Sequence, residues 1–412
     1  MTIALTVLVV GLMVFLAHAL EDLFARTRIP DVLFLLGLGL LLGPVFHVVG
    51  PQHLGAVGPV FTTLTLVIIL FEGGLGLDFD RLFHGLRGAV LLSILNFAAS
   101  MLVVVPIGRA YLGLDWMSAA ILGAILGGTS SAVVIPMVKR LRLGECTRTS
   151  LALESALSDV LVIVVALGFM SAQRMGALNL GEMAGGMMAS FLLAGAIGAL
   201  GGFAWSLALT RIHGLQNSIF TTPAFVCVVF AVVELLGYSG AIAALAMGIV
   251  LGNLERIPAR LLPRSPEALA SLNATEREVF AEVVFLLKTF FFVYIGVSIR
   301  IGGWGDLVAG LLLTAALFAI RIPVVHAALR PHQSDGTDAL ASVALNPKGL
   351  AAAVMASLPL QMGLPAGEVL RNTTFAVVLI SIVASSLLVF LLERGWLSPL
   401  ERGLFRRFTP PA

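Results

Sequence analysis

The sequence predicts an all-α polytopic membrane protein with thirteen transmembrane helices. We expect two inverted-topology six-helix repeats in which discontinuous helices, the fifth and the twelfth, cross. Three observations predict this fold. The 412 residues are 59% hydrophobic and only 12% charged, whereas soluble domains carry about 25% charged residues. Apolar stretches of about 20 residues, the length that crosses a bilayer, recur along the whole chain. Similar phrases also recur seven helices apart.

The predicted spans follow these apolar stretches in chain order. The first has no basic segment before it and no small-residue cleavage site after it, so we expect a spanning helix and not a cleaved signal. A tight turn at Gly237–Gly240 separates the eighth span from the ninth. The spans are 2–20, 30–49, 57–76, 87–110, 116–138, 149–171, 182–210, 217–236, 239–254, 278–299, 305–329, 337–362 and 371–393.

The basic residues support this count. With the N-terminus outside and the C-terminus cytoplasmic, 18 of the 25 Lys and Arg residues fall in inside loops and four in outside loops, as the positive-inside rule requires. The exceptions are Arg109, Arg174, Arg300 and Arg371 in outside loops, and Lys288, Arg321 and Lys348 within helices. We therefore expect an integral protein of a bacterial inner membrane that contacts lipid and no nucleic acid.

Phrases that recur seven helices apart indicate an inverted repeat. Leu41–Pro44 at the end of helix 2 resembles Val250–Asn253 at the end of helix 9. Leu70–Leu75 in helix 3 resembles Phe292–Val297 in helix 10. An odd offset reverses the orientation, so helices 1–6 and 8–13 form the repeats and helix 7 joins them. Paired interrupted helices in such repeats are typical of secondary transporters and mark the substrate site.

Asp159 lies near the middle of the sixth span. A charge at bilayer depth is costly and is by default a candidate for an ion or proton path. The alternative is a protonated, hydrogen-bonded Asp that only joins helices. Ser155 lies four residues earlier on the same helix face, and Ser158 lies on the neighbouring face. Hydroxyl and carboxylate oxygens suit an alkali cation, so we expect Na⁺ or K⁺ at Asp159 with Ser155 and Ser158 among its ligands.

Helix 5 is expected to break at Gly128, Thr129, Ser130 and Ser131. Glycine weakens a helix, and Ser and Thr hydroxyls satisfy or replace backbone hydrogen bonds. Unwound groups at such a break coordinate cations in transporters. We therefore predict Thr129 and Ser130 as further ion ligands, and Gly128 and Ser131 as residues of the break.

Helix 12 is expected to break at Asn346, Pro347, Lys348 and Gly349. Pro347 lacks an N–H and clashes with the preceding turn. Lys348 is expected to offset the negative C-terminal ends of the half-helices that meet there. For both breaks the alternative is a kink that merely bends the helix.

Glu154 would repel Asp159 unless it were neutralised. Arg321, deep in helix 11, is the partner we predict, because its planar guanidinium suits a buried carboxylate pair. That structural ion pair leaves Asp159 as the single titrating group. Glu72 is expected to line the mouth of the ion cavity, although a solvated carboxylate near a helix end is almost as good an interpretation.

The sequence is similar to the monovalent cation:proton antiporter superfamily, nearest the electroneutral sodium/proton exchanger branch. Leu70–Leu75 matches that family's helix-3 phrase, and Glu154–Asp159 resembles its Glu-Ser-x-x-Asn-Asp phrase with the ion-binding aspartate at Asp159. Arg321 falls where the family has the basic partner of the helix-6 Glu. The break Asn346–Gly349 resembles the family's Gly-x-Arg-Gly. Resemblance covers nearly the whole chain.

Three positions depart from the family pattern. The family's Thr-Asp-Pro is Thr129-Ser130-Ser131 here, its Asn is Ser158, and its helix-12 Arg is Lys348. These positions lie at the crossing, so they bear on cation selectivity and not on membership.

The resemblance implies a homodimer with elevator-type alternating access. A scaffold of 1–86 and 217–300 would hold a moving ion-translocating core of 87–171 and 305–393. The segment 182–210 would be a linker helix, and 394–412 a short basic cytoplasmic tail.

We therefore expect a secondary antiporter, not an enzyme, that exchanges Na⁺ or K⁺ (Li⁺ is equally compatible) for H⁺ and serves pH homeostasis. The chain has no zinc-protease, Walker or nucleophile-elbow motif, and we expect no cofactor besides the transported ions. The alternatives are a monovalent cation channel and an organic-anion carrier on the same scaffold. Asp159 argues against the anion carrier.

Overall fold

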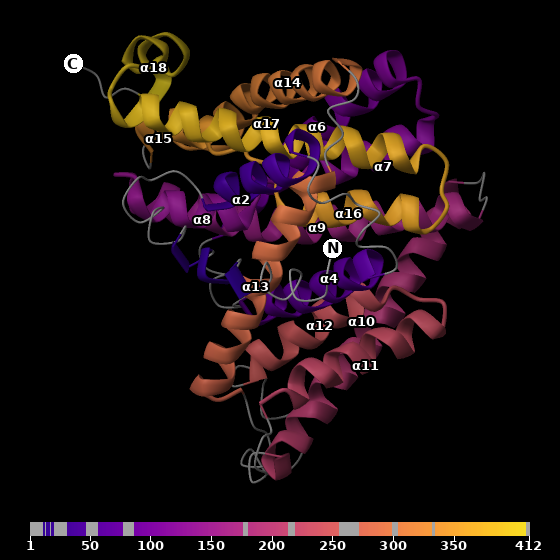
Figure 1. Cartoon of the computed structure of the whole chain (residues 1–412). Helices are drawn as coiled ribbons and strands as arrows, with labels where there is room; N and C mark the ends of the chain where they lie inside the picture. The colour runs from indigo at the N-terminus through magenta and orange to yellow at the C-terminus, as the bar shows by residue number, and fades with distance from the viewer. Residues whose placement is uncertain are drawn as a thin grey trace. The chain divides into compact units, whose positions relative to one another are not determined.

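The structure is a computed structural model that describes residues 11–12, 14–16, 18–19, 31–46, 57–76, 86–175, 180–212, 219–254, 272–298, 304–331 and 334–408. Every regular element in these ranges is a helix (Figure 1). The all-α prediction is therefore confirmed for this part of the chain. The predicted span 2–20 lies largely outside the described residues, and so do the last residues of the predicted tail, 409–412.

Six described helices are long and apolar enough to cross a membrane. They are α6 (Leu86–Leu112), α9 (Glu145–Met175), α10 (Leu180–Ile212), α13 (Ala274–Ser298), α14 (Trp304–Ala328) and α17 (Gly367–Glu393). Shorter apolar elements occupy the other predicted spans: α2 (Asp31–Leu40) with the π-helical turn η1 (Leu41–Val45), α4 (Val57–Gly76), α11 (Thr221–Leu235) and α12 (Gly240–Gly252). The chain is thus a protein with multiple membrane spans, and the number thirteen stays a prediction.

The two predicted interruptions are present. The fifth span consists of α7 (Trp116–Ile125) and α8 (Ser131–Arg140), and the twelfth consists of α15 (Gly336–Ala344) and α16 (Leu350–Gln361). Asp115 caps α7 by accepting hydrogen bonds from the N–H groups of Met117 and Ser118. Helix α15 begins with a capping box between Asp335 and Asp338, an arrangement that satisfies two end groups at once.

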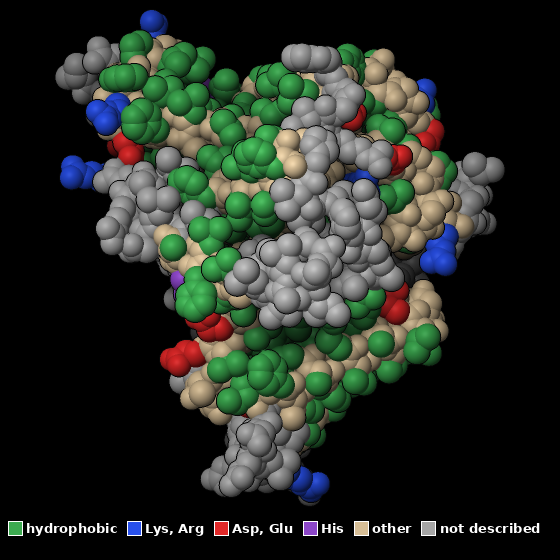
Figure 2. Space-filling model, viewed as in Figure 1, with side chains coloured by type: hydrophobic (Ala, Val, Ile, Leu, Met, Phe, Trp, Pro, Cys, Tyr) green, Lys and Arg blue, Asp and Glu red, His purple; other side chains and the backbone are tan. Residues whose placement is uncertain are grey.

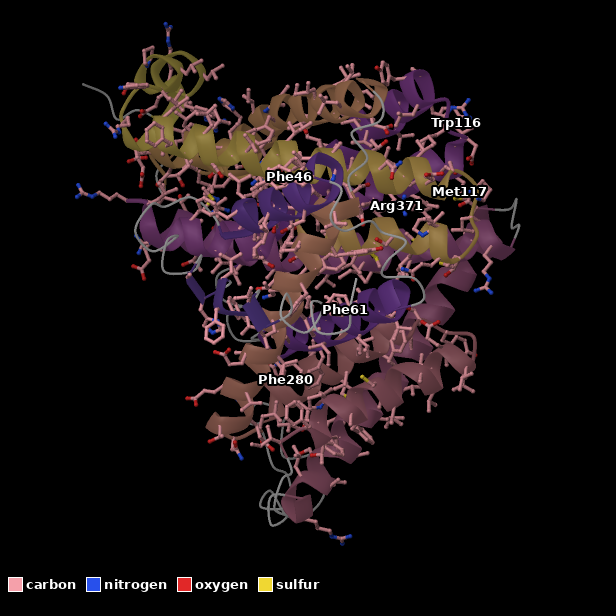
Figure 3. The ribbon with its side chains drawn as sticks, in the orientation of Figure 1. Phe46, Phe61, Trp116, Met117, Phe280 and Arg371 are labelled. Atoms are coloured by element: carbon pink, nitrogen blue, oxygen red, sulfur yellow. The ribbon has the colours of Figure 1, made fainter. Side chains whose placement is uncertain are left out.

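The chain divides into two compact units. Unit 1 comprises 1–55, 85–170 and 289–412 and contains both interrupted helices. Within it, α14 packs against α6 and α17, and α7 packs against α6, α16 and α17 (Figure 1). At the beginning of α7, Trp116 and Met117 are labelled in Figure 3, and the Arg109 guanidinium lies 4.4 Å from the Trp116 ring centroid. The segments α18 (Ser398–Leu404) and η4 (Arg406–Phe408) pack against α15.

Unit 2 comprises 56–84 and 171–288. Its α12 packs against α4, α10 and α11. Ser239 caps α12 directly after Gly237, whose φ of 83° suits glycine in the tight turn predicted from the sequence. The ring centroids of Phe71 in α4 and Phe280 in α13 lie 5.2 Å apart, and Phe280 is labelled in Figure 3.

Glycine pairs bring the backbones of two helix pairs into close contact. In unit 1, a Cβ added to Gly296 of α13 would lie 2.8 Å from the Cα of Gly39 in α2. In unit 2, a Cβ added to Gly74 of α4 would lie 3.0 Å from the Cα of Gly248 in α12. Real Cβ atoms do not approach that closely, so both contacts require glycine. The sequence repeat makes Gly39 equivalent to Gly248 and Gly74 equivalent to Gly296, so the two contacts are counterparts of each other.

Among the described residues coloured in Figure 2, most side chains on the visible face are hydrophobic or uncharged, and few are charged. Large exposed apolar side chains such as Leu102, Leu200 and Leu387 are normal on helices that face lipid. By contrast, Glu154, Arg321 and Lys348 are almost completely buried. Charged groups in such positions need partners, and these partners define the candidate site.

Candidate functional site at the crossing of two interrupted helices

The two interruptions touch each other inside unit 1. The backbone N–H of Ser130 donates to the carbonyl oxygen of Pro347 across a distance of 2.8 Å. A Cβ on Gly349 would collide with the Ser130 side chain, so only glycine allows this approach. The two breaks are therefore in direct contact, and one backbone hydrogen bond joins them. That the two broken helices cross stays a prediction.

Lys348 lies at the carboxyl ends of the half-helices. Its Nζ donates to the carbonyl oxygen of Gly128, just past the end of α7, at 2.8 Å. It also donates to Oδ1 of Asn346, just past the end of α15, at 3.0 Å. Carboxyl ends of helices carry partial negative charge, which an ammonium group offsets. The side chain thus lies where the sequence placed it, and it is only 1% exposed.

Two serines support the breaks in the same way. The N–H of Thr129 donates to Oγ of Ser158 in α9 at 3.0 Å, and the N–H of Lys348 donates to Oγ of Ser381 in α17 at 2.9 Å. Each hydroxyl in turn donates to the carbonyl three residues earlier in its own helix. Sequence reasoning missed Ser381. The signal was available, since Ser381 lies in helix 13 where the repeat places the counterpart of helix 6.

Asp159 lies beside the first residue of α8. The hydroxyl of Ser131 donates to Oδ2 of Asp159 at 2.5 Å, and both residues are partly exposed. The amino end of α8 carries partial positive charge, which favours a carboxylate nearby. The interrupted helices therefore turn an amino end toward the carboxylate of Asp159 and carboxyl ends toward the ammonium of Lys348.

The other predicted ligands lie close in sequence but have different contacts. Thr129 Oγ1 is 3.1 Å from Ser158 Oγ. The buried Ser130 Oγ makes no hydrogen bond within the described residues. Ser155 is completely buried, and its hydroxyl donates to the Ala152 carbonyl at 2.9 Å. Their roles as ion ligands stay predictions.

Glu154 and Arg321 form a forked ion pair, the pairing expected from the sequence. Nη1 of Arg321 contacts Oε1 of Glu154, and Nη2 donates to Oε2 at 2.6 Å. Nε of Arg321 donates to the carbonyl oxygen of Ser342 in α15 at 3.0 Å. The two side chains are 1% and 0% exposed. The pair therefore links α9, α14 and α15, and each of the three guanidinium nitrogens of Arg321 has a partner.

Glu72 has a different setting, in unit 2. Its Oε2 lies 3.5 Å from Nζ of Lys288, and the two side chains are 40% and 31% exposed.

A second polar contact that sequence reasoning missed lies in unit 1, where Nδ2 of Asn96 in α6 donates to the carbonyl of Gly127 at 3.4 Å. Only the fold brings helix 4 to that break, so no local pattern could have found it.

Comparisons with known proteins agree with this geometry. The family described as sodium/hydrogen exchanger, transmembrane, matches residues 9–394. A K⁺/H⁺ antiporter, NhaP of Alkalimonas amylolytica, is 26% identical over 98% of this chain and 67% of its own length. A Na⁺/H⁺ antiporter, NhaS2 of Synechocystis, is 25% identical over 72% of this chain and 53% of its own length. The chain thus spans about half to two thirds of these relatives.

A solved structure shares the fold. The sodium proton antiporter MjNhaP1 from Methanocaldococcus jannaschii, determined at pH 8, superimposes with a TM-score of 0.72 at 20% sequence identity. The match covers 98% of this chain and 99% of that one. It extends over both units and both interrupted helices, so the fold assignment does not depend on the site alone.

Proposed function

The chain belongs to the sodium/hydrogen exchanger family, and we propose that it exchanges a monovalent cation, Na⁺ or K⁺, for a proton across the membrane. One observation carries the proposal. Asp159 is a partly exposed carboxylate in an apolar helix, at the amino end of a half-helix, next to a crossing of two interrupted helices. The relatives named above as K⁺/H⁺ and Na⁺/H⁺ antiporters support both cations.

Exchange follows from competition for one carboxylate. Asp159 binds either a proton or a dehydrated cation, and either ligand neutralises it. The ionised, empty carboxylate would lose its hydration on crossing an apolar barrier, which costs several kcal/mol per ion or more. The occupied forms avoid much of that cost. Because only occupied forms cross, each cation that moves in one direction is matched by a proton that moves in the other.

We infer a stoichiometry of one cation per proton, which makes transport electroneutral. Glu154 is held by Arg321 in a forked pair, so its negative charge is already balanced by a fixed partner. Ser158, next to Asp159, is uncharged and holds the Thr129 backbone. Asp159 is then the single group that changes its charge during a cycle.

The finer architecture belongs to the same proposal: thirteen spans, two inverted repeats and a homodimer with elevator-type movement of a core of 87–171 and 305–393. Repeated contacts support the inverted repeats. Gly43 packs against Val297 in unit 1, and Gly252 packs against Leu75 in unit 2. The repeat makes Gly43 equivalent to Gly252, and Leu75 equivalent to Val297.

The proposal is tested with Asp159→Asn, which keeps the size of the side chain and removes its charge. Purified protein in proteoliposomes with an imposed pH gradient should dissipate that gradient when Na⁺ or K⁺ is added, and the variant should not. A membrane-potential dye should stay silent during turnover of the wild type. Exchange by Asp159→Asn would refute the role of Asp159, and a cation current without proton movement would indicate a channel.

A further inference from the structure

Three consecutive hydroxyls, those of Thr129, Ser130 and Ser131, lie in the break of the fifth span, and they face different neighbours. That of Thr129 faces Ser158 at 3.1 Å. That of Ser130 is buried against Gly349. Ser131 directs its hydroxyl to Asp159. Consecutive residues at a break point in different directions, so their sequence alone does not reveal which hydroxyl meets the carboxylate.

The position of Ser131 is fixed by the backbone. The N–H of Ser130 is bonded to Pro347 of the other break, and the carbonyl of Ser130 accepts from the N–H groups of Val133 and Val134. These bonds hold the residues on both sides of Ser131. Its side chain therefore reaches Asp159 from a rigid first turn of α8, which is the kind of support that precise ion ligands need.

A hydroxyl that donates to a carboxylate keeps its own lone pairs. Ser131 Oγ gives its hydrogen to Asp159 Oδ2, and its oxygen remains an acceptor. A cation that binds Asp159 from the exposed side could therefore be held by a carboxylate oxygen and by this neutral oxygen together. Oxygen ligands of this type suit hard cations. A proton on Asp159 needs no such second ligand.

We propose that Ser131 is a cation-binding residue that sets the affinity of Asp159 for the metal ion relative to the proton. This inference deepens the proposed exchange and rests on it. It assigns the neutral ligand at the break to Ser131, in place of the role as a mere break residue expected from the sequence. Ser130, the hydroxyl residue that directly precedes Ser131, contributes less to cation affinity.

The experiment compares the cation KM and kcat of exchange for the wild type, Ser131→Ala, Ser131→Thr and Ser130→Ala in proteoliposomes. Loss of a hydrogen-bonding ligand to a charged group should raise the KM of Ser131→Ala about tenfold, with kcat nearly unchanged. Ser131→Thr keeps the hydroxyl and should stay within about threefold of the wild type. Ser130→Ala should raise the KM less than Ser131→Ala does.

Two further variants distinguish the loss of an oxygen ligand from the loss of the folded structure. Ser131→Cys keeps the shape but replaces oxygen by sulfur, a poor ligand for alkali cations, and should also raise the KM. Ser386→Ala is the matched control, since this hydroxyl bonds within α17 to the Ile382 carbonyl at 2.8 Å, and its KM should equal that of the wild type.

Cation binding without turnover separates this inference from the proposed function. NaCl or KCl, compared with choline chloride, should raise the unfolding temperature of the wild type in detergent. The increase should vanish in Asp159→Asn and be reduced in Ser131→Ala and Ser131→Cys. If wild-type exchange failed while this pattern held, the exchange proposal would fall and the ligand assignment would stand. Unchanged KM and unchanged cation protection in both Ser131 variants would overturn the assignment.

Discussion

The ion pair between Glu154 and Arg321 gives the sharpest energetic prediction. Both side chains are almost completely buried, and each satisfies the other through two parallel contacts. Removing one partner leaves the other as an unpaired buried charge, which costs about 3–5 kcal/mol. We therefore expect Glu154→Leu and Arg321→Met each to lower the free energy of unfolding by that amount.

The double variant should be more stable than either single variant. Replacing a buried pair by apolar side chains of similar volume is often nearly neutral. Here one penalty remains, because the carbonyl of Ser342 loses its donor from Arg321, at a cost of about 1–3 kcal/mol. The assay is thermal or denaturant unfolding of purified protein in detergent, analysed as a double-mutant cycle. Additive losses, with the double variant the least stable, would refute this view of the pair.

Three further predictions concern local structure. Ser381→Ala removes the acceptor of the Lys348 N–H and should lower the free energy of unfolding by about 1–3 kcal/mol. The control variant Ser386→Ala should lower it clearly less, because that hydroxyl bonds only within its own helix α17. Equal losses in the two variants would contradict the role of Ser381 as the acceptor at the break. Asp115→Ala should cost about 1 kcal/mol, as the loss of a helix cap does. Partial burial of Asp115 opposes its ionisation, but hydrogen bonds from the first turn of α7 outweigh burial and hold the pKa of this carboxyl below its ordinary 3.8. A lowered pKa stabilises the fold above the unfolded-state pKa and ceases to do so as the pH falls through the folded-state pKa, so the unfolding temperatures of wild type and Asp115→Ala should converge only in strong acid. Phe405→Ala empties a completely buried position and should lower the free energy of unfolding by about 3–5 kcal/mol in the same assay. A loss as small as that of a surface substitution would show that the segment after α17 is not packed as described.

Much of the fold was predictable because membrane burial restricts what a sequence can contain. Charged residues are rare in apolar spans, so Glu154 and Arg321 could be matched by elimination. The breaks were predictable for a similar reason, since Gly128 and Pro347 disfavour helix wherever they occur. Helix ends were less accurate. Helix α9 extends over Glu145–Met175, beyond the predicted 149–171, because polar end residues continue a helix past the apolar core.

The detailed contacts of the site were not predictable to the same degree. Which of the hydroxyls in the first break faces Asp159 depends on the backbone torsions of the break, which no periodicity encodes. The contact of Asn96 with Gly127 depends on how α6 packs. Ser381 could have been found by extending the repeat from helices 5 and 12 to helices 6 and 13. The missed residues are thus those whose partners come from another helix.

The two segments that the sequence repeat relates make similar hydrogen bonds at their breaks but differ in their charged groups. Ser158 and Ser381 hold the N–H groups of Thr129 and Lys348 in equivalent ways. The residue after Ser158 is Asp159, whereas the residue after Ser381 is the completely buried Ile382. In the proposed mechanism the second break thus holds a fixed ammonium group where the first takes an exchangeable cation, and the carboxylate of Asp159 has an apolar counterpart in Ile382. A symmetric pair of carboxylates would give two titrating groups and a different stoichiometry. The one-to-one exchange proposed here therefore depends on the divergence of the repeats as much as on their similarity.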